Sequence, residues 1–271
     1  MAEKWGRRGI LLVYAVIIII PLLVVIFGSF KSIGQLYSSP LAVPIPPTGK
    51  NFTSLVTTAN IGVPILNSAI LSAGTLIITL YFGSLAAYGL ARIKGWVGWA
   101  IWGALVLGMT VPAQTSLVPL YVTFRALGLT DNLFGLILVE TVHAIPVAVF
   151  ILGGFMRALP RELYEASSID GAGPWRTYRS VIMPLSTPSL AATAIFLFVI
   201  VWNDLLYPLF FTTSASVQTL PLALLAFQGE FLTNYPAIFA GVAVASLPVV
   251  VAYIFLQRYF IAGMTAGATK G

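Results

Sequence analysis

The chain of 271 residues is 59% hydrophobic and only 8% charged, with a formal net charge of +6. This composition excludes a soluble globular domain and is typical of a protein that crosses a membrane several times. The absence of cysteine excludes a disulfide framework and a cysteine-ligated metal site. The positive charges lie in the gaps between apolar runs, so membrane topology explains them better than nucleic-acid binding does.

The first apolar run covers residues 9–30 and follows a short N-terminal segment that carries basic residues. A cleaved signal peptide has a shorter apolar core and a small-residue cleavage site close behind it. We therefore expect a retained first transmembrane helix. The next segment, residues 31–62, is interrupted by prolines, and we expect it to form an extended loop outside the membrane.

Five further apolar runs are each near or above the ~20 residues that a helix needs to cross a bilayer. These runs cover residues 64–91, 97–124, 133–155, 189–211 and 236–257. Prolines inside them, such as Pro112, are tolerated in membrane helices when neighbours satisfy the freed carbonyl groups, and they would kink the helices. The pattern predicts an all-α membrane protein with six transmembrane helices.

Six spans place both termini on the same side of the membrane. If that side is the cytoplasm, only three of the 14 basic residues, Lys31, Lys50 and Arg125, lie outside. Because basic residues concentrate in cytoplasmic loops, this asymmetry predicts a multi-pass protein with both termini in the cytoplasm.

The longest polar interruption late in the chain, at about residues 158–188, falls between the fourth and fifth spans. We expect one helix from Pro160 to about Ile169, stopped at Asp170-Gly171, because proline suits a first helical turn and glycine a C-terminal stop. A second short helix should begin at Pro174 and end at Pro184. Three residues share its apolar face at i, i+3 and i+7 spacing, namely Trp175, Tyr178 and Ile182.

The order of residues in this loop resembles the EAA loop of the membrane subunits of ATP-binding-cassette importers. The matching residues are Glu165-Ala166, Asp170-Gly171-Ala172, Ile182, Pro184 and Pro188. Ser167 stands where the family usually has Ala, and Met183 where it usually has Leu. In that family the loop forms cytoplasmic coupling helices seated in a groove of the ATPase subunit. The alternative is an amphipathic hairpin that lies on the bilayer surface.

Nearly the whole chain resembles the second permease subunit of carbohydrate importers of the maltose type. The additional matching segments are Asn67-Ser68, 87–92, 119–121, 127–131, 202–204 and 262–271. The resemblance implies the type I importer permease fold, with one transmembrane permease domain over residues 1–271. The residues that it assigns to ATPase coupling are Glu165, Ala166, Ser167, Asp170, Gly171 and Lys270.

The resemblance also implies the partners and the location of the chain. The partners are a homologous permease subunit, two ATPase subunits and an extracytoplasmic sugar-binding protein, all at a bacterial or archaeal cytoplasmic membrane. The sequence contains no phosphate-binding loop of the Gly-x-x-x-x-Gly-Lys-Ser/Thr type. ATP and Mg²⁺ therefore belong on the partner ATPase subunits, and we expect this chain to bind no cofactor.

Two polar groups inside the apolar runs are candidates for the substrate path. Glu140 and His143 lie at i, i+3 spacing on the fourth span, where ionisable groups are costly and line a cavity or pair with each other. A single histidine cannot build a metal site. Trp202-Asn203-Asp204, in the fifth span, offers a carboxylate, an amide and an aromatic ring that suit sugar hydroxyls and a sugar face. The structural alternative for each group is a polar pair or an interfacial aromatic.

The function expected from these features is that of a permease subunit in an ATP-driven, binding-protein-dependent importer of carbohydrate, and not that of an enzyme. The loop around Glu165 would couple a separate ATPase to alternating access of the spans. Three alternatives stay open: a glycerol-phosphate-type importer permease, a polytopic membrane enzyme acting on a lipid, and a passive channel. A membrane enzyme would need acidic, His or Lys groups that converge near one interface.

Overall fold

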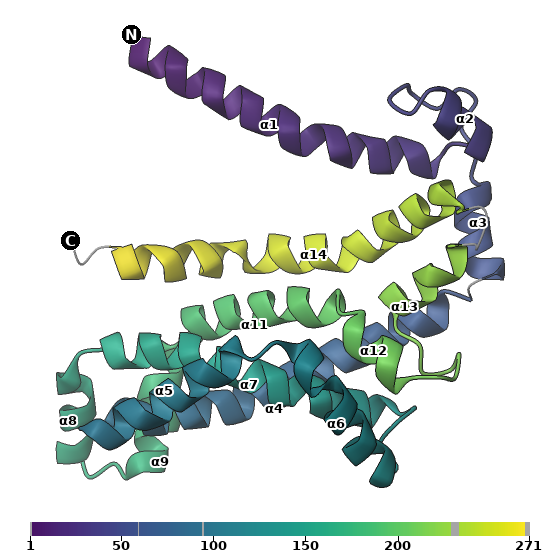
Figure 1. The fold of residues 1–271 in the computed structure, drawn as a ribbon. Helices are drawn as coiled ribbons and strands as arrows, with labels where there is room; N and C mark the ends of the chain where they lie inside the picture. Colours follow the sequence, from purple (N-terminus) through teal and green to yellow (C-terminus); the bar gives the residue numbers. More distant parts are fainter. Residues whose placement is uncertain (1, 59, 94, 229–232, 269–271) are drawn as a thin grey trace. The chain divides into compact units, whose positions relative to one another are not determined.

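The computed structural model describes residues 2–58, 60–93, 95–228 and 233–268. These residues form helices joined by loops and contain no strand (Figure 1). Within them, helices long and apolar enough to cross a membrane cover Gly6–Ser29, Gly62–Arg92, Leu133–Ala158 and Tyr235–Phe255. Two bent helix pairs raise the number of spans from 4 to as many as 6 if each pair counts as one span. The prediction of an all-α membrane protein is confirmed.

The third predicted span, residues 97–124, is not one continuous helix. Helices α5 (Trp96–Thr110) and α6 (Ala113–Ala126) meet at 92°. Between them Val111 has φ −73° and ψ 120°, which is extended backbone. Pro112 causes this break because it cannot donate a backbone hydrogen bond and it disfavours helical backbone at the residue before it. The kink expected at this proline is therefore a full break between two helices.

The fifth predicted span, residues 189–211, also consists of two helices. α11 (Thr187–Trp202) is followed by a short non-helical stretch, after which α12 (Leu206–Phe211) begins. The 16 residues of α11 extend over about 24 Å, which is shorter than the ~30 Å hydrocarbon core of a bilayer. The helical segment Pro174–Leu185 precedes α11 at an angle of 73°.

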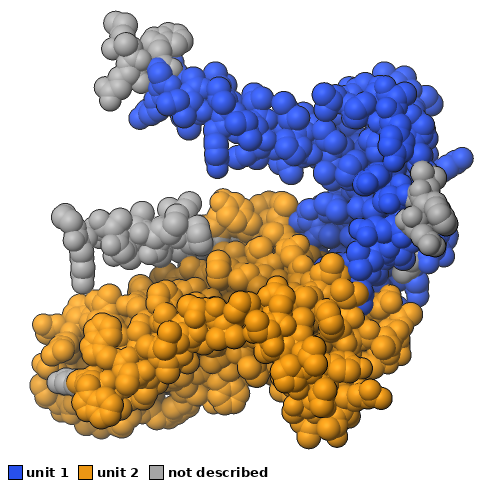
Figure 2. Space-filling model, viewed as in Figure 1, with its two compact units in different colours: residues 1–65, 219–248 blue, residues 66–218, 249–271 orange. Residues whose placement is uncertain are grey.

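The chain folds into two compact units, which are coloured separately in Figure 2. Unit 1 covers Met1–Ile65 and Thr219–Pro248. Its helices are α1 (Ala2–Ser29), α2 (Ile33–Ser38), α3 (Lys50–Thr57), α13 (Leu220–Leu224), η2 (Leu225–Phe227) and the first part of α14 (Tyr235–Ala268). A single permease domain over the whole chain stays a prediction.

The segment expected to be an extended loop, residues 31–62, instead contains two short helices, α2 and α3. α2 begins with a capping box in which the side chains of Ser32 and Gln35 each accept a hydrogen bond from the other residue's backbone N–H. The side chain of Lys31 is only 1% exposed, and its ammonium group donates to the carbonyls of Ser39 and Pro40, each at 2.8 Å. These two hydrogen bonds satisfy the ammonium group of the buried Lys31 side chain, which would be costly to bury without partners.

Unit 2 covers Leu66–Gln218 and Val249–Gly271, and it contains the candidate functional residues. Its helices are most of α4 (Gly62–Arg92), α5, α6, α7 (Leu133–Ala158), α8 (Arg161–Ile169), α9 (Pro174–Thr177), the π-helical turn η1 (Tyr178–Ile182), α10 (Met183–Leu185), α11, α12 and the last part of α14. The core of this unit forms around α7, which packs against α5, α11 and α12.

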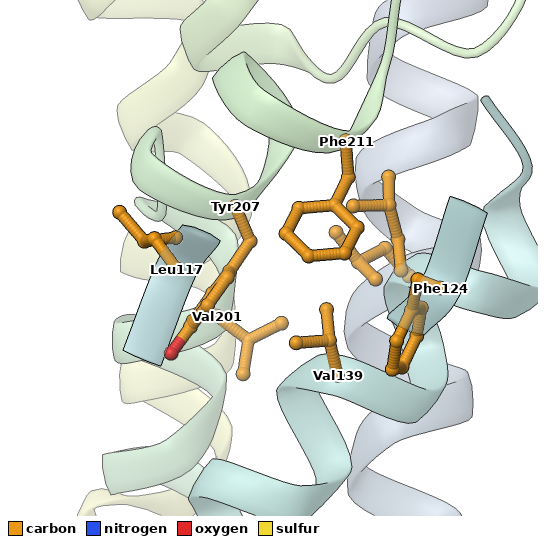
Figure 3. Packing of buried hydrophobic residues seen from close by; sticks show 8 residues of the cluster. Leu117, Phe124, Val139, Val201, Tyr207 and Phe211 are labelled. Atoms are coloured by element: carbon orange, nitrogen blue, oxygen red, sulfur yellow. The ribbon is translucent and has the colours of Figure 1, made fainter. Parts of the chain in front are cut away.

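Two of the buried apolar clusters along α7 adjoin the candidate functional residues. One surrounds Val139, where Phe211 of α12 meets Phe124 of α6 with ring centroids 5.4 Å apart (Figure 3). The other surrounds Leu152 and joins the ends of α4 and α7 to η1. Small residues let these helices approach closely, since a Cβ at Gly83 of α4 would lie 2.9 Å from the Cβ of Ala148. The second cluster fixes the loop that follows α7.

Candidate functional site

The first helix of the loop after α7, α8, ends where the sequence predicts. Gly171 has φ +73°, a left-handed conformation that glycine adopts without strain. The N–H of Gly171 donates to the carbonyl of Ser168 at 3.1 Å, and that of Ala172 to the carbonyl of Ser167 at 2.9 Å. These two bonds form a Schellman motif, which satisfies carbonyls at the end of α8 and turns the chain sharply.

Ser167 holds α8 against α9. Its hydroxyl and that of Thr177 lie 3.0 Å apart, and the two residues are only 6% and 4% exposed. A small side chain is needed at this contact, and the hydroxyl of serine adds a buried hydrogen bond that alanine would lack. Ser167 therefore lies inside the loop, whereas Glu165, Ala166 and Asp170 lie on its exposed surface.

The second helical segment differs from the expectation that it would end at Pro184. It continues through Pro184 to Leu185, because a π-helical turn, η1, precedes the proline. In that turn the N–H of Met183 donates to the carbonyl of Tyr178, five residues earlier. The predicted apolar face is present only in part, since Tyr178 and Ile182 are buried but Trp175 is 55% exposed.

Tyrosine side chains attach the loop to the spans. Tyr178 and Ser84 of α4 place their hydroxyl oxygens 2.8 Å apart, and the hydroxyl of Tyr88 donates to the carbonyl of Pro174 at 3.0 Å. The hydroxyl of Tyr164 in α8 donates to the carbonyl of Met156 in α7, also at 3.0 Å. Burial raises the pKa of Tyr164, so its hydroxyl stays a donor throughout the neutral range. The loop is thus bonded to both α4 and α7.

The sequence did not single out Tyr88 and Tyr164 as functional residues. Tyr88 lies in a segment that carries the family resemblance, and Tyr164 immediately precedes Glu165, but their hydrogen bonds depend on how α4 and α7 pack. The rings of Tyr88 and Tyr178 are 5.3 Å apart, and those of Tyr88 and Tyr164 are stacked at 6.4 Å. The expected coupling residue Lys270 lies outside the described residues.

The second candidate group brings Glu140 and His143 of α7 close to Asp204. The carboxyl groups of Glu140 and Asp204 lie close enough to interact electrostatically, and so do Asp204 and His143. Glu140 is only 4% exposed, and its Oε1 has no hydrogen-bond partner in the described part of the chain. His143 lies against the ring of Tyr207, with centroids 4.9 Å apart. Glu140 is buried and His143 and Asp204 are half-buried, so these groups form a partly buried polar cluster near Val139 and Tyr207 of the apolar cluster.

Asp204 has a structural task as well, because it caps α12. Its Oδ1 accepts a hydrogen bond from the N–H of Leu206 at 3.3 Å, and its Oδ2 accepts one from the N–H of Tyr207 at 3.0 Å. This explains why a helix begins again directly after the break that ends α11. Asp204 therefore belongs to a helix start rather than to the interior of a span.

The two residues that precede Asp204 in the chain make other contacts. Trp202 is only 3% exposed and packs against Phe198, with ring centroids 5.6 Å apart. Asn203 is exposed, and its side-chain amide donates to the carbonyl of Val199 at 2.8 Å. Of the five residues expected in a substrate path, the structure brings Glu140, His143 and Asp204 together and does not add Trp202 or Asn203 to them. In the described residues, His, Asp and Glu form no group of three that could hold a metal ion.

Comparison with known proteins shows which family this chain belongs to. Residues 79–266 match the model of the family described as binding-protein-dependent transport system inner membrane component. The diacetylchitobiose uptake system permease protein NgcG of Streptomyces coelicolor is 36% identical over 265 residues, covering 97% of this chain and 88% of that protein. The melibiose/raffinose/stachyose import permease protein MelC of Bacillus subtilis is 36% identical over 253 residues, covering 93% and 91%. A crystal structure of a bacterial ABC transporter that imports alginate has a similar fold, with a TM-score of 0.81, 17% identity and coverage of 96% of both chains.

Proposed function

Because the chain belongs to the family of binding-protein-dependent transport system inner membrane components, we propose that it is a permease subunit of an ATP-driven importer of carbohydrate. It is a multi-pass transport subunit and not an enzyme. The proposed substrate class, di- or oligosaccharides or a related sugar, is supported by relatives whose names specify diacetylchitobiose and melibiose, raffinose and stachyose. The proposed partners are a second permease subunit, two ATPase subunits that bind ATP and Mg²⁺, and an extracytoplasmic sugar-binding protein.

The observation that carries this proposal is the attachment of the loop to the spans. The loop presents exposed groups on one side, including Glu165, and Ile169 with an exposed fraction of 86%. On its other side, hydroxyl bonds and ring contacts join the loop to α4 and α7. A force applied to α8 would therefore move these two spans.

The mechanism follows from the coupling free energy between two sites. ATP binding closes the partner ATPase dimer, and the docked loop transmits that change to the spans, which switch between inward-facing and outward-facing arrangements. This requires the loop to face the cytoplasm. The excess of basic residues on the same side as residues 158–188 supports that orientation, with both termini in the cytoplasm.

Replacement of Glu165 by Ala tests the coupling role. If Glu165 pairs with a basic residue in a partly desolvated ATPase groove, its removal should weaken docking by about 2–5 kcal/mol, which is roughly 30-fold or more. Uptake should be lost, and the ATPase subunits should dissociate during purification or stop responding to loaded binding protein. Insertion should be normal, since Glu165 lies outside the spans.

The matched control is Glu162→Ala, one turn earlier on the same exposed helix. Glu162 interacts favourably with the N-terminal end of α8 but has no proposed partner across the groove. Wild-type transport by Glu165→Ala, or the same loss in both variants, would refute the coupling role.

For the substrate path, we propose that Asp204 contributes its charge to a polar passage together with Glu140 and His143. The buried, partly unsatisfied carboxyl group of Glu140 supports this role, because an ionisable group at membrane depth is costly unless it lines a path or is fully paired. Trp202 and Asn203 are proposed to flank this path and not to contact the three groups.

Two substitutions separate the charge of Asp204 from its capping role. Asn keeps an oxygen that can cap α12, whereas Ala removes the cap at a cost of about 1 kcal/mol. If the charge serves the path, Asp204→Asn should impair sugar uptake as severely as Asp204→Ala, while the complex still assembles and hydrolyses ATP. Wild-type uptake by Asp204→Asn at limiting sugar would leave only the structural role.

A further inference from the structure

A large pocket lies where α4, α5, α7 and α8 come together beside the coupling loop. Its volume is about 960 Å³, at the upper end of the ~300–1,000 Å³ that ligand sites in proteins occupy. The pocket is separate from the buried cluster around Glu140, which does not line it. Glu165 and Ile169, which the proposed coupling role places against the ATPase, line part of it, but the transport function described above gives no role to its arginines.

The charged residues that line the pocket are mostly basic. They are Arg92 at the end of α4, Arg157 in the last turn of α7, Arg161 at the start of α8, and Glu165. The three arginines are exposed, so their guanidinium groups are accessible to a ligand. Three arginines around one space create a field that favours an anion.

The contacts of these arginines leave their charge without a carboxylate partner in the described part of the chain. One nitrogen of Arg92 donates to the hydroxyl of Tyr88 at 3.0 Å, and one of Arg157 donates to the carbonyl of Leu90 at 3.4 Å. The guanidinium of Arg157 also lies 4.3 Å from the ring centroid of Trp102. Each guanidinium has five N–H donors in a planar fork, so most of these donors stay available to a second ligand.

Aromatic residues place the pocket at a membrane surface. Trp99, which lines it, is 71% exposed, and Trp96, at the start of α5, is 79% exposed. Tryptophan side chains gather at the level of lipid headgroups because one part of the ring is apolar and another is polar. Basic pockets between transmembrane helices at this level bind the phosphate headgroups of lipids.

We propose that this pocket binds a phosphate-bearing anion through Arg92, Arg157 and Arg161. Two sources supply this chemistry, the headgroup of an anionic phospholipid and free phosphate. A bound anion would lie beside Glu165 and Tyr164, so it would interact directly with the proposed coupling helix α8. Placing the pocket in the cytoplasmic leaflet rests on the proposed function, but the binding itself does not.

The test uses the full chain, purified with its partner subunits in detergent and examined by native mass spectrometry. The complex is titrated with phosphatidylglycerol and, separately, with phosphatidylcholine of the same acyl chains. We expect preferential retention of phosphatidylglycerol, weakened roughly fivefold for each arginine that is removed. The double variant with Arg157→Gln and Arg161→Gln should therefore reduce the retention of phosphatidylglycerol by roughly 25-fold.

Arg179→Gln is the matched control, because Arg179 is an exposed arginine of the same loop that does not line the pocket. It should retain phosphatidylglycerol as the wild type does. Arg161→Gln alone provides a milder variant if the double substitution prevents assembly, since α8 begins at this exposed position. Its retention should fall about fivefold.

A second arm titrates inorganic phosphate against the same set of proteins. Arginine-dependent binding of phosphate without a preference for phosphatidylglycerol would support the site and assign it to a free anion. Equal retention of both lipids by the wild type and the variants, with no arginine-dependent phosphate binding, would overturn the proposal. Because binding is measured without transport, a failed coupling test at Glu165 would leave this result unaffected.

Discussion

At the scale of single residues, Asp131 shows how one carboxylate ties distant segments together. Its side chain accepts hydrogen bonds from the backbone N–H of Thr213 at 2.9 Å and of Ser214 at 2.8 Å, and from the hydroxyl of Ser214. These donors, led by the Ser214 hydroxyl, lower the pKa of Asp131 to about 2. The turn before α7 is thereby fastened to the loop after α12.

Asp131 should make the stability of this region depend on acid. A carboxylate whose pKa is lower in the folded state stabilises the fold fully above its unfolded pKa of about 3.9, and this stabilisation is lost as the pH falls toward 2. We expect the thermal unfolding midpoint to fall less for Asp131→Asn than for the wild type between pH 5 and pH 3. An unchanged slope for Asp131→Asn would show that these hydrogen bonds do not favour the charged form.

At the scale of elements, the proposed coupling loop depends on the turn between α8 and α9. Gly171 has φ +73°, and a Cβ added there would meet no atom within 4 Å. A side chain at this position would therefore act through backbone strain alone, at about 1–2 kcal/mol. That strain is relieved only if α9 moves relative to α8, which would disturb the hydroxyl contact between Ser167 and Thr177.

Gly171→Ala should weaken coupling while leaving insertion intact. Fewer ATPase subunits should remain bound after purification, and hydrolysis should respond less to loaded binding protein. Gly173→Ala is a close control, because Gly173 has φ −67° and equal space around it. The prediction is wrong if the two alanine variants couple equally well.

At the scale of the whole molecule, the orientation in the membrane is open to direct measurement. The chain has no cysteine, so a single introduced cysteine can be labelled without background. Ser39, in the segment after α1, and Ser168, in α8, are both exposed. In intact spheroplasts, Ser39→Cys should react with a membrane-impermeant maleimide, whereas Ser168→Cys should react only after permeabilisation.

A cysteine at Ser189, which is only 5% exposed, controls for access and should label poorly from either side. Labelling of both Ser39→Cys and Ser168→Cys from outside would contradict the six-span orientation. It would also remove the coupling loop from the reach of a cytoplasmic ATPase.

Local features of this protein could be predicted from the sequence. The apolar runs, the end of α8 at Asp170-Gly171 and the positive φ of Gly171 each depend on residues that are neighbours in the chain. Backbone preferences act over a few residues, so glycine and proline positions are enough to predict such boundaries. The resemblance of the loop to coupling helices of importers was visible for the same reason.

The tertiary structure decided the features that depend on packing between segments. Pro112 indicated a kink, but the 92° angle between α5 and α6 depends on what each helix packs against. The bonds of Tyr88 to Pro174 and of Tyr164 to Met156, and the meeting of Glu140 with Asp204, join different elements. Such contacts depend on how the helices are positioned relative to one another. No local sequence pattern specifies these positions, because many side chains on each helix could contact a neighbouring helix.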